Sequence, residues 1–168
     1  MVRKSLRAAT AAAAIAAAAS FAGNAYAQDT IKVGAILSQS PPGSVVQGTQ
    51  VIHGLEIARD MINESGGILG KQVELLIEDG QGVPEKGRAA AEKLITKDGV
   101  VALTGEHQSS NVLAEIEVAK RYNVPYVNTN GWSDAIRTKG YPQVFNPSNY
   151  NTRIAHAMAT VIRDMGVK

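Results

Sequence analysis

The fold is decided by Val100-Val101-Ala102-Leu103-Thr104-Gly105-Glu106-His107-Gln108-Ser109-Ser110-Asn111. A short apolar run ends in glycine, passes through three polar residues and reaches two serines at the expected start of a helix. Near-continuous apolar runs are typical of buried parallel strands, and ligands of open α/β sheets collect beyond the carboxyl ends of such strands. Because a helix start offers unpaired N–H groups and a positive dipole end, Gly105–Asn111 predicts a site for an anionic small molecule.

The flanking sequence predicts strands and helices that alternate along the chain. Besides the strand that begins at Val100, we expect strands over residues 31–37, 72–79 and 125–129, and a short strand within 141–147. Periodic apolar positions predict helices over residues 51–65, 85–97, 110–122 and 151–165, with a loop over 38–50. This order predicts an α/β fold with a doubly wound parallel sheet and right-handed crossovers.

Apolar residues at helical spacing mark the faces that should pack against the sheet. They are Val51, Leu55, Ala58 and Ile62 with Ile57 and Met61 beside them, then Ala89, Ala90, Leu94 and Ile95, then Val112, Leu113, Ile116 and Ala119. Pro84 suits the first position of a helix, and Gly66-Gly67 suits a helix end. Ser110 or Asn111 is expected to cap the helix that follows Gly105.

Residues 1–27 have the pattern of a secretory signal peptide. Arg3, Lys4 and Arg7 make a basic beginning, Ala8 to Ala19 is almost entirely alanine, and Ala25-Tyr26-Ala27 is a small-x-small cleavage pattern. The alanine run is too short and too weakly apolar to span ~30 Å of hydrocarbon. We therefore expect export with cleavage after Ala27 and no membrane insertion.

The charge balance changes when this segment is left out. The whole chain has 17 Lys and Arg residues and 15 Asp and Glu residues, and three of the basic residues but no acidic residue lie in residues 1–27. The remainder therefore carries a net charge of −1, which gives no indication of nucleic-acid binding. The chain has no cysteine, so disulfides cannot stabilise the fold and a thiolate cannot take part in its chemistry.

The residue patterns of metal, phosphate and nucleophile sites are missing from the sequence. His53, His107 and His156 share no spacing of metal ligands. Gly105–Asn111 lacks a glycine-rich phosphate signature, and Ser109 lacks the G-x-S-x-G context of a serine nucleophile. We therefore predict no metal and no cofactor, and we expect that the protein is not an enzyme.

Glu78 and Asp79 are paired carboxylates at the end of a predicted strand. Adjacent strand residues point to opposite faces, so the two carboxylates should not act together. We interpret Asp79 as a residue that orders the loop after its strand.

Several short motifs fall at spacings that resemble those of one protein family. They are Ile31-Lys32-Val33-Gly34, the run Ile62–Gly70, Asp79, Gly105 with Ser109-Ser110, Val124-Pro125 and the loop Asn128–Trp132. Together with the export signal, their order resembles the periplasmic branched-chain amino acid binding proteins of ABC transporters, which have the type I periplasmic binding fold. The resemblance covers Ile31 to Lys168.

The resemblance implies a protein of two lobes that closes on its ligand by a hinge. Residues 1–27 would be the signal peptide, residues 28–147 the Rossmann-like first lobe, and residues 148–168 the start of the second lobe. Gly166-Val167-Lys168 reads as the approach to a further strand, so we expect a truncated chain. The second-lobe ligand contacts would then be missing, and the apolar face of the helix over 151–165 would be exposed.

The resemblance also implies which residues contact a ligand. Ser109 matches the serine that binds a ligand carboxylate with its hydroxyl and backbone N–H, and Ser110 is interpreted as the helix cap. In the alternative, both serines cap the helix. Asn130 and Gly131 lie in the loop where the family uses a main-chain carbonyl towards a ligand ammonium. Trp132 stands where many members carry a threonine for that ammonium.

Two departures from the family pattern bear on the ligand. The indole of Trp132 donates a hydrogen bond but accepts none from an ammonium, although its ring can hold a cation or stack on an aromatic ligand. Gln47 lies near the position of an aromatic residue that covers the ligand side chain. Both departures argue against a plain leucine or isoleucine pocket. His107 is either a further ligand contact or an exposed loop histidine.

The predicted function is that of a periplasmic substrate-binding component of an ABC importer. Its ligands would be branched-chain or related amino acids or other small carboxylates, aromatic acids included, and its protein partner would be the transporter permease. The alternative is an exported ligand sensor of the same fold that reports to a regulatory receptor, and an exported α/β enzyme is disfavoured. Genes for a permease and an ATPase beside this gene would favour the importer over the sensor.

Overall fold

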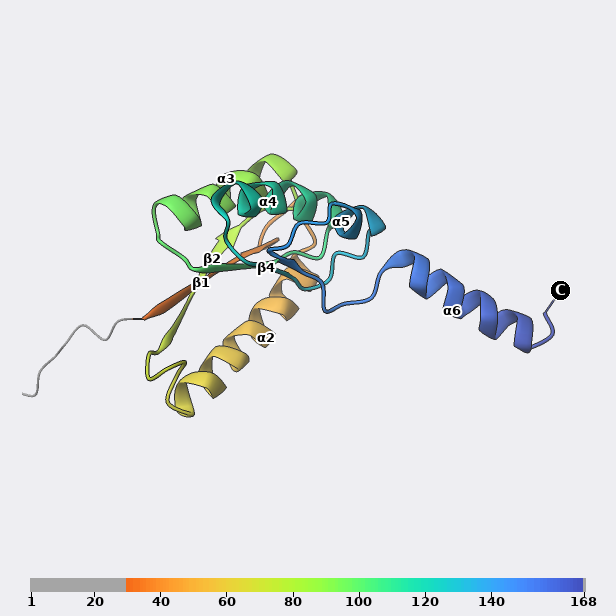
Figure 1. Ribbon diagram of the computed structural model, residues 1–168, viewed down its shortest axis with the longest axis horizontal. Coiled ribbons are helices and arrows are strands. Elements are labelled where there is room, and N and C mark those ends of the chain that lie inside the picture. The colour runs from red at the N-terminus through yellow and green to blue at the C-terminus, as the bar shows by residue number, and fades with distance from the viewer. Residues whose placement is uncertain (1–29, 168) are drawn as a thin grey trace, which may run out of the picture.

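Residues 30–167 are described by this computed structural model, which Figure 1 shows as a ribbon. The strands are β1 (Ile31–Leu37), β2 (Val73–Asp79), β3 (Ala102–Gly105), β4 (Tyr126–Asn128) and β5 (Val144–Phe145). The helices are α2 (Val45–Glu64), α3 (Pro84–Thr96), α4 (Ser109–Tyr122), α5 (Asp134–Thr138) and α6 (Asn151–Asp164). The predicted signal peptide, residues 1–27, lies outside the described residues.

Within residues 30–167 the strands form one parallel sheet in the order β2-β1-β3-β4-β5. Helices α3, α4 and α5 cover one face of the sheet and α2 lies on the other face (Figure 1). Strand β1 pairs with β2 as far as Leu37↔Asp79 and with β3 as far as Ile36↔Gly105, so these strands end at the same edge. The predicted α/β fold with a doubly wound parallel sheet is confirmed.

The core lies between the sheet and the helices α3 and α4. Ile36 on β1, Leu103 on β3 and Tyr126 on β4 have no exposed surface, and Leu94 on α3 and Ile116 on α4 close over them. Burying a large aliphatic side chain stabilises a fold by ~1.5–3 kcal/mol. This core holds the central strands in place, and their carboxyl ends carry the loops described below.

Helix α2 begins at Val45 rather than at Val51, so the predicted loop over 38–50 was too long. A Cβ atom at Gly48 would lie 1.9 Å from the carbonyl oxygen of Ser38. Glycine therefore allows the first turn of α2 to lie directly on the loop after β1. Local propensity disfavours glycine inside a helix, and tertiary packing overrides that preference here.

The predicted apolar faces are only partly correct. Ile57, Ala58 and Met61 of α2 are exposed, because α2 packs on the edge strand β2 and its neighbour β1, so only a narrow stripe of the helix is covered. On α3, Ala89 is exposed and Ala91 is buried instead. The reason is that α3 packs against α4 as well as the sheet, which turns its buried stripe towards α4.

The element ends agree with the sequence more closely than the faces do. Pro84 is the first residue of α3, as predicted, and α2 ends just before Gly66, which has a φ of 102°. The third strand begins at Ala102 rather than at Val100. The short helix α5 was not predicted, although Ser133 is its N-cap and accepts a hydrogen bond from the backbone N–H of Ala135 at 3.3 Å.

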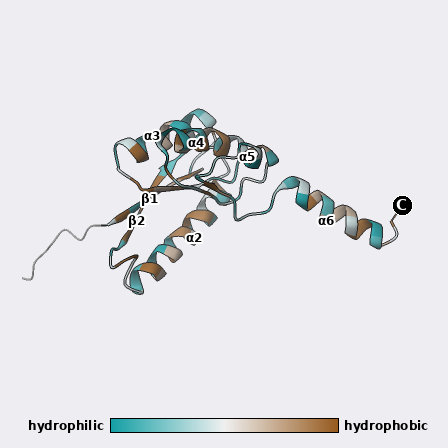
Figure 2. Cartoon of the chain, viewed as in Figure 1, coloured by the Kyte–Doolittle hydropathy of each residue, from teal (hydrophilic) through white to brown (hydrophobic). Residues whose placement is uncertain are grey.

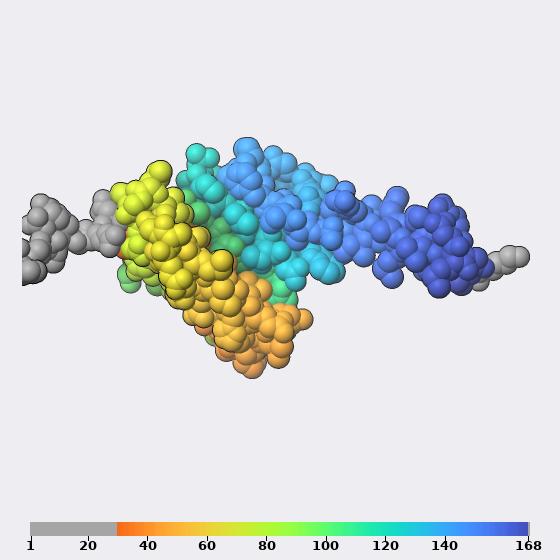
Figure 3. Space-filling model, turned by 90° about the horizontal axis from the view of Figure 1, so that it is seen from below, coloured from red at the N-terminus to blue at the C-terminus, as the bar shows by residue number. Residues whose placement is uncertain are grey.

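Helix α6 corresponds to the predicted helix over 151–165. It extends away from the sheet, as Figures 1 and 3 show, and none of its residues is buried. Met158, Val161 and Ile162 are exposed, and Figure 2 shows hydrophobic positions along the helix. Within residues 30–167 no helix has both the length and the apolar character that a membrane crossing requires.

Candidate functional site

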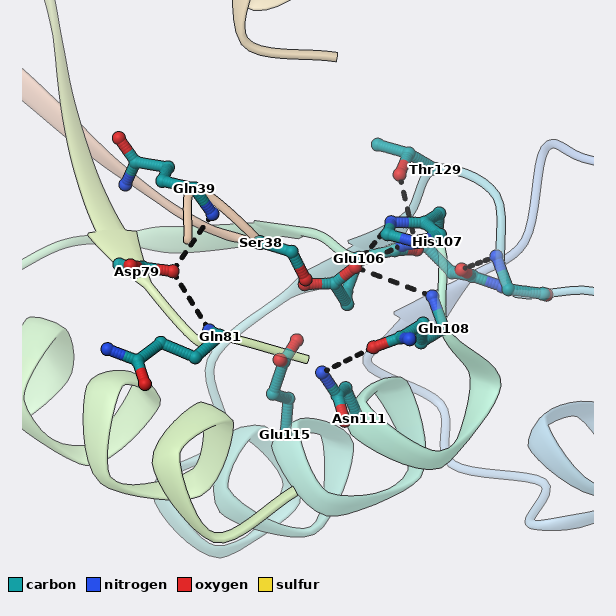
Figure 4. Close-up of polar contacts among 12 residues, drawn as sticks. Ser38, Gln39, Asp79, Gln81, Glu106, His107, Gln108, Asn111, Glu115 and Thr129 are labelled. Atoms are coloured by element: carbon teal, nitrogen blue, oxygen red, sulfur yellow. Dashed lines mark hydrogen bonds and ion pairs between the residues drawn. The ribbon is translucent and has the colours of Figure 1, made fainter. Parts of the chain in front are cut away.

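The candidate site lies where the carboxyl ends of the parallel strands meet. Four loops gather at this edge: residues 38–44 after β1, 80–83 after β2, 106–108 after β3 and 129–133 after β4. Figure 4 shows polar side chains from several of these loops close together. Helix α4 begins at this edge, directly after the loop that follows β3.

Glu106, which no sequence pattern indicated as a site residue, joins two of these loops. Its side chain is completely buried. One carboxylate oxygen accepts hydrogen bonds from the backbone N–H groups of His107 at 2.8 Å and Gln108 at 3.4 Å, and the other accepts from the Ser38 hydroxyl at 3.2 Å (Figure 4). Hydrogen bonds of this kind offset the cost of burying a polar side chain. Glu106 therefore fixes the loop that leads into α4.

His107 lies against this carboxylate. Its Nδ1 is 2.7 Å from Oε1 of Glu106, a contact that is attractive only when Nδ1 carries a hydrogen. The side chain is only 10% exposed, so the interpretation of His107 as an exposed loop histidine is wrong. Its role as a ligand contact stays a prediction.

Ser109 and Ser110 are the first two residues of α4, and the N-cap position belongs to Gln108. No side chain caps this helix, so the prediction that Ser110 or Asn111 caps it is wrong, as is the alternative that both serines do. The Ser109 hydroxyl instead accepts a hydrogen bond from the backbone N–H of Ser133 at 3.1 Å. The backbone N–H of Asn111 donates to the Gln108 carbonyl at 3.0 Å, whereas helix geometry leaves the N–H groups of Ser109 and Ser110 without an acceptor inside α4.

The loop after β4 is shaped by Asn128, which has no more than 1% of its surface exposed. Its side chain donates to the carbonyl of Gly131 at 2.7 Å and accepts from the N–H of Gly131 at 2.8 Å. A Cβ atom at Gly131 would lie 2.9 Å from atoms of Asn128, Val112 and Ile136, so the turn is closely packed. The loop leaves Asn130 exposed on its outer side.

The structure thus brings together some of the predicted site residues and leaves others apart. Ser109 contacts the loop that carries Gly131 and Trp132, and the indole of Trp132 is 41% exposed. Gln47 is exposed on the first turn of α2, and among the described residues no hydrogen bond joins it to Ser109 or to the loop after β4. Ser133, which makes the contact with Ser109, was missed.

Asp79 orders its loop, as predicted. Its carboxylate accepts a hydrogen bond from the Ser40 hydroxyl at 2.5 Å. It also accepts from the backbone N–H groups of Gln39 and Gln81 at 2.9 Å each (Figure 4). Burial acts to raise the pKa of Asp79, but these hydrogen bonds outweigh it, so the pKa lies below its ordinary value. The neighbouring Glu78 turns away and pairs with Lys93 of α3 at 2.6 Å.

The residues within 30–167 offer no cluster of three or more acidic, histidine or cysteine side chains that could hold a metal ion. His53 on α2 and His156 on α6 are both exposed and belong to helices far apart in the fold (Figure 1). The candidate site thus combines hydrogen-bond donors at the start of α4 with the buried Glu106 carboxylate and the His107 ring.

A family model described as "Periplasmic binding protein" matches residues 30–168. The Leu/Ile/Val-binding protein homolog 7 of Brucella suis biovar 1 is 28% identical over 154 residues, which make up 89% of this chain and 37% of that protein. Two solved structures also resemble the chain. The branched-chain amino acid transporter substrate-binding protein LivJ of Streptococcus pneumoniae, in complex with isoleucine, is 29% identical with a TM-score of 0.69 over 73% of this chain and 34% of LivJ.

The second structure is an ABC transporter solute-binding protein of R. palustris in complex with benzoate. It is 25% identical with a TM-score of 0.74, and the match covers 83% of this chain and 38% of that protein. The chain thus spans little more than a third of the length of each of these proteins.

Proposed function

Because the chain belongs to the periplasmic binding protein family, we propose that it acts in the periplasm as part of the substrate-binding component of an ABC importer. In this role it binds a small carboxylate and presents it to the transporter permease. The related proteins with bound isoleucine and benzoate are named as transporter binding proteins, which supports binding rather than catalysis.

The described residues supply the first lobe of this component. We assign residues 28–147 to that lobe and residues 148–168 to the start of a second lobe, and residues 1–27 to the export signal. The boundary is supported by α6, which has no buried residue. The chain matches only 37% of the length of its Brucella relative, which leaves room for a further lobe in the whole protein. The ligand then lies between this lobe and one that the matched region does not include.

One observation carries the proposal, namely that Ser109 opens α4 at the carboxyl edge of the sheet. The N–H groups of Ser109 and Ser110, which have no acceptor inside α4, and the positive end of the helix dipole attract a carboxylate. The Ser109 hydroxyl accepts from Ser133 through its oxygen and still has its own hydrogen to donate. A ligand carboxylate at this point therefore receives charge-assisted hydrogen bonds from the helix start and from the Ser109 hydroxyl.

The ligand class follows from the neighbouring loop. The loop after β4 places Asn130, Gly131 and Trp132 next to Ser133, which contacts Ser109. The exposed indole of Trp132 offers a flat apolar surface to the body of the ligand. Isoleucine and benzoate, the ligands of two similar proteins, share only a carboxylate. We therefore place the carboxylate at Ser109 and the ligand body near Trp132, with aromatic acids as the preferred class.

The proposal is tested by NMR titration of the chain with benzoate and with isoleucine. Because binding sites for small molecules bury most of the ligand surface, one lobe alone should bind only weakly, in the millimolar range. We expect the amide signals of Ser109, Ser110 and Gly131 to shift on titration. Ser109→Ala should weaken binding by about tenfold or more, the loss expected for a hydrogen bond to a charged group.

Ser65→Ala is the matched control, because Ser65 is the C-cap residue at the far end of α2 and its hydroxyl donates to the Ile62 carbonyl of that helix. This variant should bind both acids as the unchanged chain does. If the acids shift signals elsewhere and leave Ser109 and Ser110 unaffected, the carboxylate does not bind at the start of α4 and the proposal is wrong. Nanomolar affinity would instead contradict the assignment of half the site to a second lobe.

A further inference from the structure

The start of α6 is held by the lobe from which it extends. Asp134, the first residue of α5, accepts two hydrogen bonds on Oδ2, from the backbone N–H of Thr152 at 3.2 Å and from its hydroxyl at 2.8 Å. The carbonyl of Trp132 accepts a third, from the N–H of Asn151 at 2.9 Å. We call these four residues, Trp132, Asp134, Asn151 and Thr152, the α6 junction.

The junction does for α6 what a local capping residue does for other helices. The N-cap residue of α6 is Tyr150, and it makes no capping hydrogen bond with its side chain. The first N–H groups of a helix need external acceptors, and a carboxylate at this end also meets the positive end of the helix dipole. Asp134 supplies that carboxylate from another helix, so the direction of α6 depends on the position of Asp134.

Arg137 holds the segment that leads into the junction. Its guanidinium donates to the carbonyl of Ser148 at 2.5 Å and lies over the ring of Tyr150, 4.3 Å from the ring centre. Beyond these contacts α6 is not packed against the lobe, since none of its residues is buried and its apolar face is exposed. The direction in which α6 leaves the lobe is thus set by a few polar contacts around its first turn.

The same loop contacts the proposed ligand site. Ser133 lies between Trp132 and Asp134 in the sequence, and its backbone N–H donates to the Ser109 hydroxyl at 3.1 Å. Its own hydroxyl accepts from Ala135 and so begins α5, whose first residue is Asp134. A short path of contacts therefore connects Ser109 to the first turn of α6 through Ser133 and Asp134.

We propose that Ser133 and Asp134 couple the ligand position at Ser109 to the direction of α6. Ser133 and Asp134 are positioning residues in this scheme, because neither needs to touch the ligand. When a ligand carboxylate accepts a hydrogen bond from the Ser109 hydroxyl, the hydroxyl oxygen becomes a better acceptor and the bond from the Ser133 N–H strengthens. Ligand binding then tightens the junction and narrows the range of directions that α6 adopts.

The coupling rests on the proposed function for the place of the ligand, but the contact path exists without ligand and is tested without it. The chain has no cysteine, so two introduced cysteines are the only sites for spin labels. Lys97 after α3 and Thr160 on α6 are both exposed and carry the labels, whose distance distribution reports the direction of α6. Amide exchange at Thr152 and Ser133 reports the two ends of the path.

Asp134→Ala should broaden the distance distribution and raise the exchange rate of the Thr152 amide about fivefold, the factor expected when a helix loses a capping side chain. Ser109→Ala should raise the exchange rate of the Ser133 amide and also broaden the distribution, although Ser109 does not touch α6. Asp134→Asn keeps an acceptor oxygen and should restore most of the Thr152 protection. A structural defect of the whole fold is recognised by faster exchange at the buried residue Leu103.

Asp164→Ala is the matched control, because Asp164 pairs only with Arg163 within the exposed end of α6. It removes the same charge and should leave the distribution unchanged. If Asp134→Ala leaves the distribution as narrow as before, the junction does not set the direction of α6. If only Ser109→Ala leaves it unchanged, the coupling to the ligand site is overturned. Failure of benzoate and isoleucine to bind is a separate result that bears on the proposed function alone.

Discussion

Tyr126 on β4 donates its phenolic hydrogen to Oε2 of Glu115 on α4 at 2.5 Å, and both side chains are fully buried. Burial raises the pKa of Glu115 well above its ordinary value; the hydrogen bond from Tyr126 opposes this rise, and the charge of Glu106 adds to it. Oε1 of Glu115 has no hydrogen-bond partner among the described residues and faces Gly87, where a Cβ atom would lie 2.6 Å away. The fold therefore favours the neutral form of Glu115.

The free energy of unfolding should consequently fall as the pH rises above ~4.3, the ordinary value for glutamate. The folded state keeps a proton on Glu115 that the unfolded state releases, so this contribution is lost as the pH rises through the folded pKa. Glu115→Gln keeps an oxygen that accepts from Tyr126 but does not titrate. Its stability should depend less on pH in this window, as measured by urea denaturation at a series of pH values.

Glu117, two residues along α4, provides a control with the opposite sign. The hydrogen bond from Lys139 is the main cause that lowers its pKa; burial opposes this, and the Tyr141 hydroxyl adds to it. Its contribution to stability is present above ~4.3 and is lost as the pH falls through the folded pKa. Glu117→Gln should therefore change the pH dependence of the free energy of unfolding only below pH ~4.3. An unchanged slope above pH ~4.3 in Glu115→Gln would show that Glu115 is charged in the fold.

Gly48 and Gly54 lie in the same helix, and the same substitution should act on them in opposite directions. Gly54→Ala should stabilise the protein by ~0.5–1 kcal/mol, since alanine favours a helix and no atom lies within 4 Å of the new methyl group. Gly48→Ala should destabilise it by about 3 kcal/mol or more, because the methyl group would lie 1.9 Å from the Ser38 carbonyl oxygen. Thermal and urea unfolding of both variants measure the difference.

A stabilising Gly48→Ala would mean that the first turn of α2 does not rest on the loop after β1. In that case the helix would begin nearer Val51, as the sequence alone predicted. Gly54→Ala serves as the internal control, since it reports the intrinsic preference of α2 for alanine without a tertiary contact.

Local signals predicted the fold well where one segment decides its own structure. The apolar run of β1 and the proline at the start of α3 have this character, and both elements lie where the sequence placed them. The start of α2 could not be predicted in the same way, because it depends on the contact between Gly48 and Ser38 rather than on propensity. The buried stripe of α3 likewise depends on α4, a neighbour that the sequence does not specify.

The candidate site shows the same limit more strongly. The strand–turn–helix pattern placed Ser109 at a helix start, but its contact with Ser133 joins residues 24 positions apart. Glu106 lies within the stretch that decided the fold, yet its hydroxyl partner Ser38 is 68 positions away. Long-range polar contacts of this kind produce no periodic pattern in the sequence, so they become visible only in the folded structure.

Removing residues 148–168 should leave the first lobe folded and make the chain more soluble. Met158, Val161 and Ile162 form an exposed apolar face on α6, and such a face favours association between molecules. Size-exclusion chromatography and solubility measurements compare the two lengths. Met158→Gln with Ile162→Gln in the longer chain should give a similar gain while keeping α6. Lower solubility after the removal would show that α6 packs on the first lobe and that the boundary at Pro147 is wrong.

The last prediction concerns Trp132, whose exposed indole lies in the loop that contacts Ser109 through Ser133. An indole accepts no hydrogen bond from an ammonium, but it stacks on an aromatic ring with a gain of ~0.5–1.5 kcal/mol beyond the buried area. The chain should therefore bind benzoate more tightly than isoleucine. Trp132→Thr should lower the affinity for benzoate by about two- to tenfold, the factor that this stacking energy implies.

The same substitution should raise the affinity for isoleucine, because a threonine hydroxyl accepts a hydrogen bond from the ligand ammonium. Trp132→Phe keeps an aromatic face without the indole N–H, so it should retain the preference for benzoate and separate stacking from hydrogen bonding. NMR titration of the three proteins with both acids measures the ratio of affinities. Equal ratios in the unchanged chain and in Trp132→Thr would mean that the indole does not face the ligand, and the carboxylate at Ser109 would then carry recognition in this lobe alone.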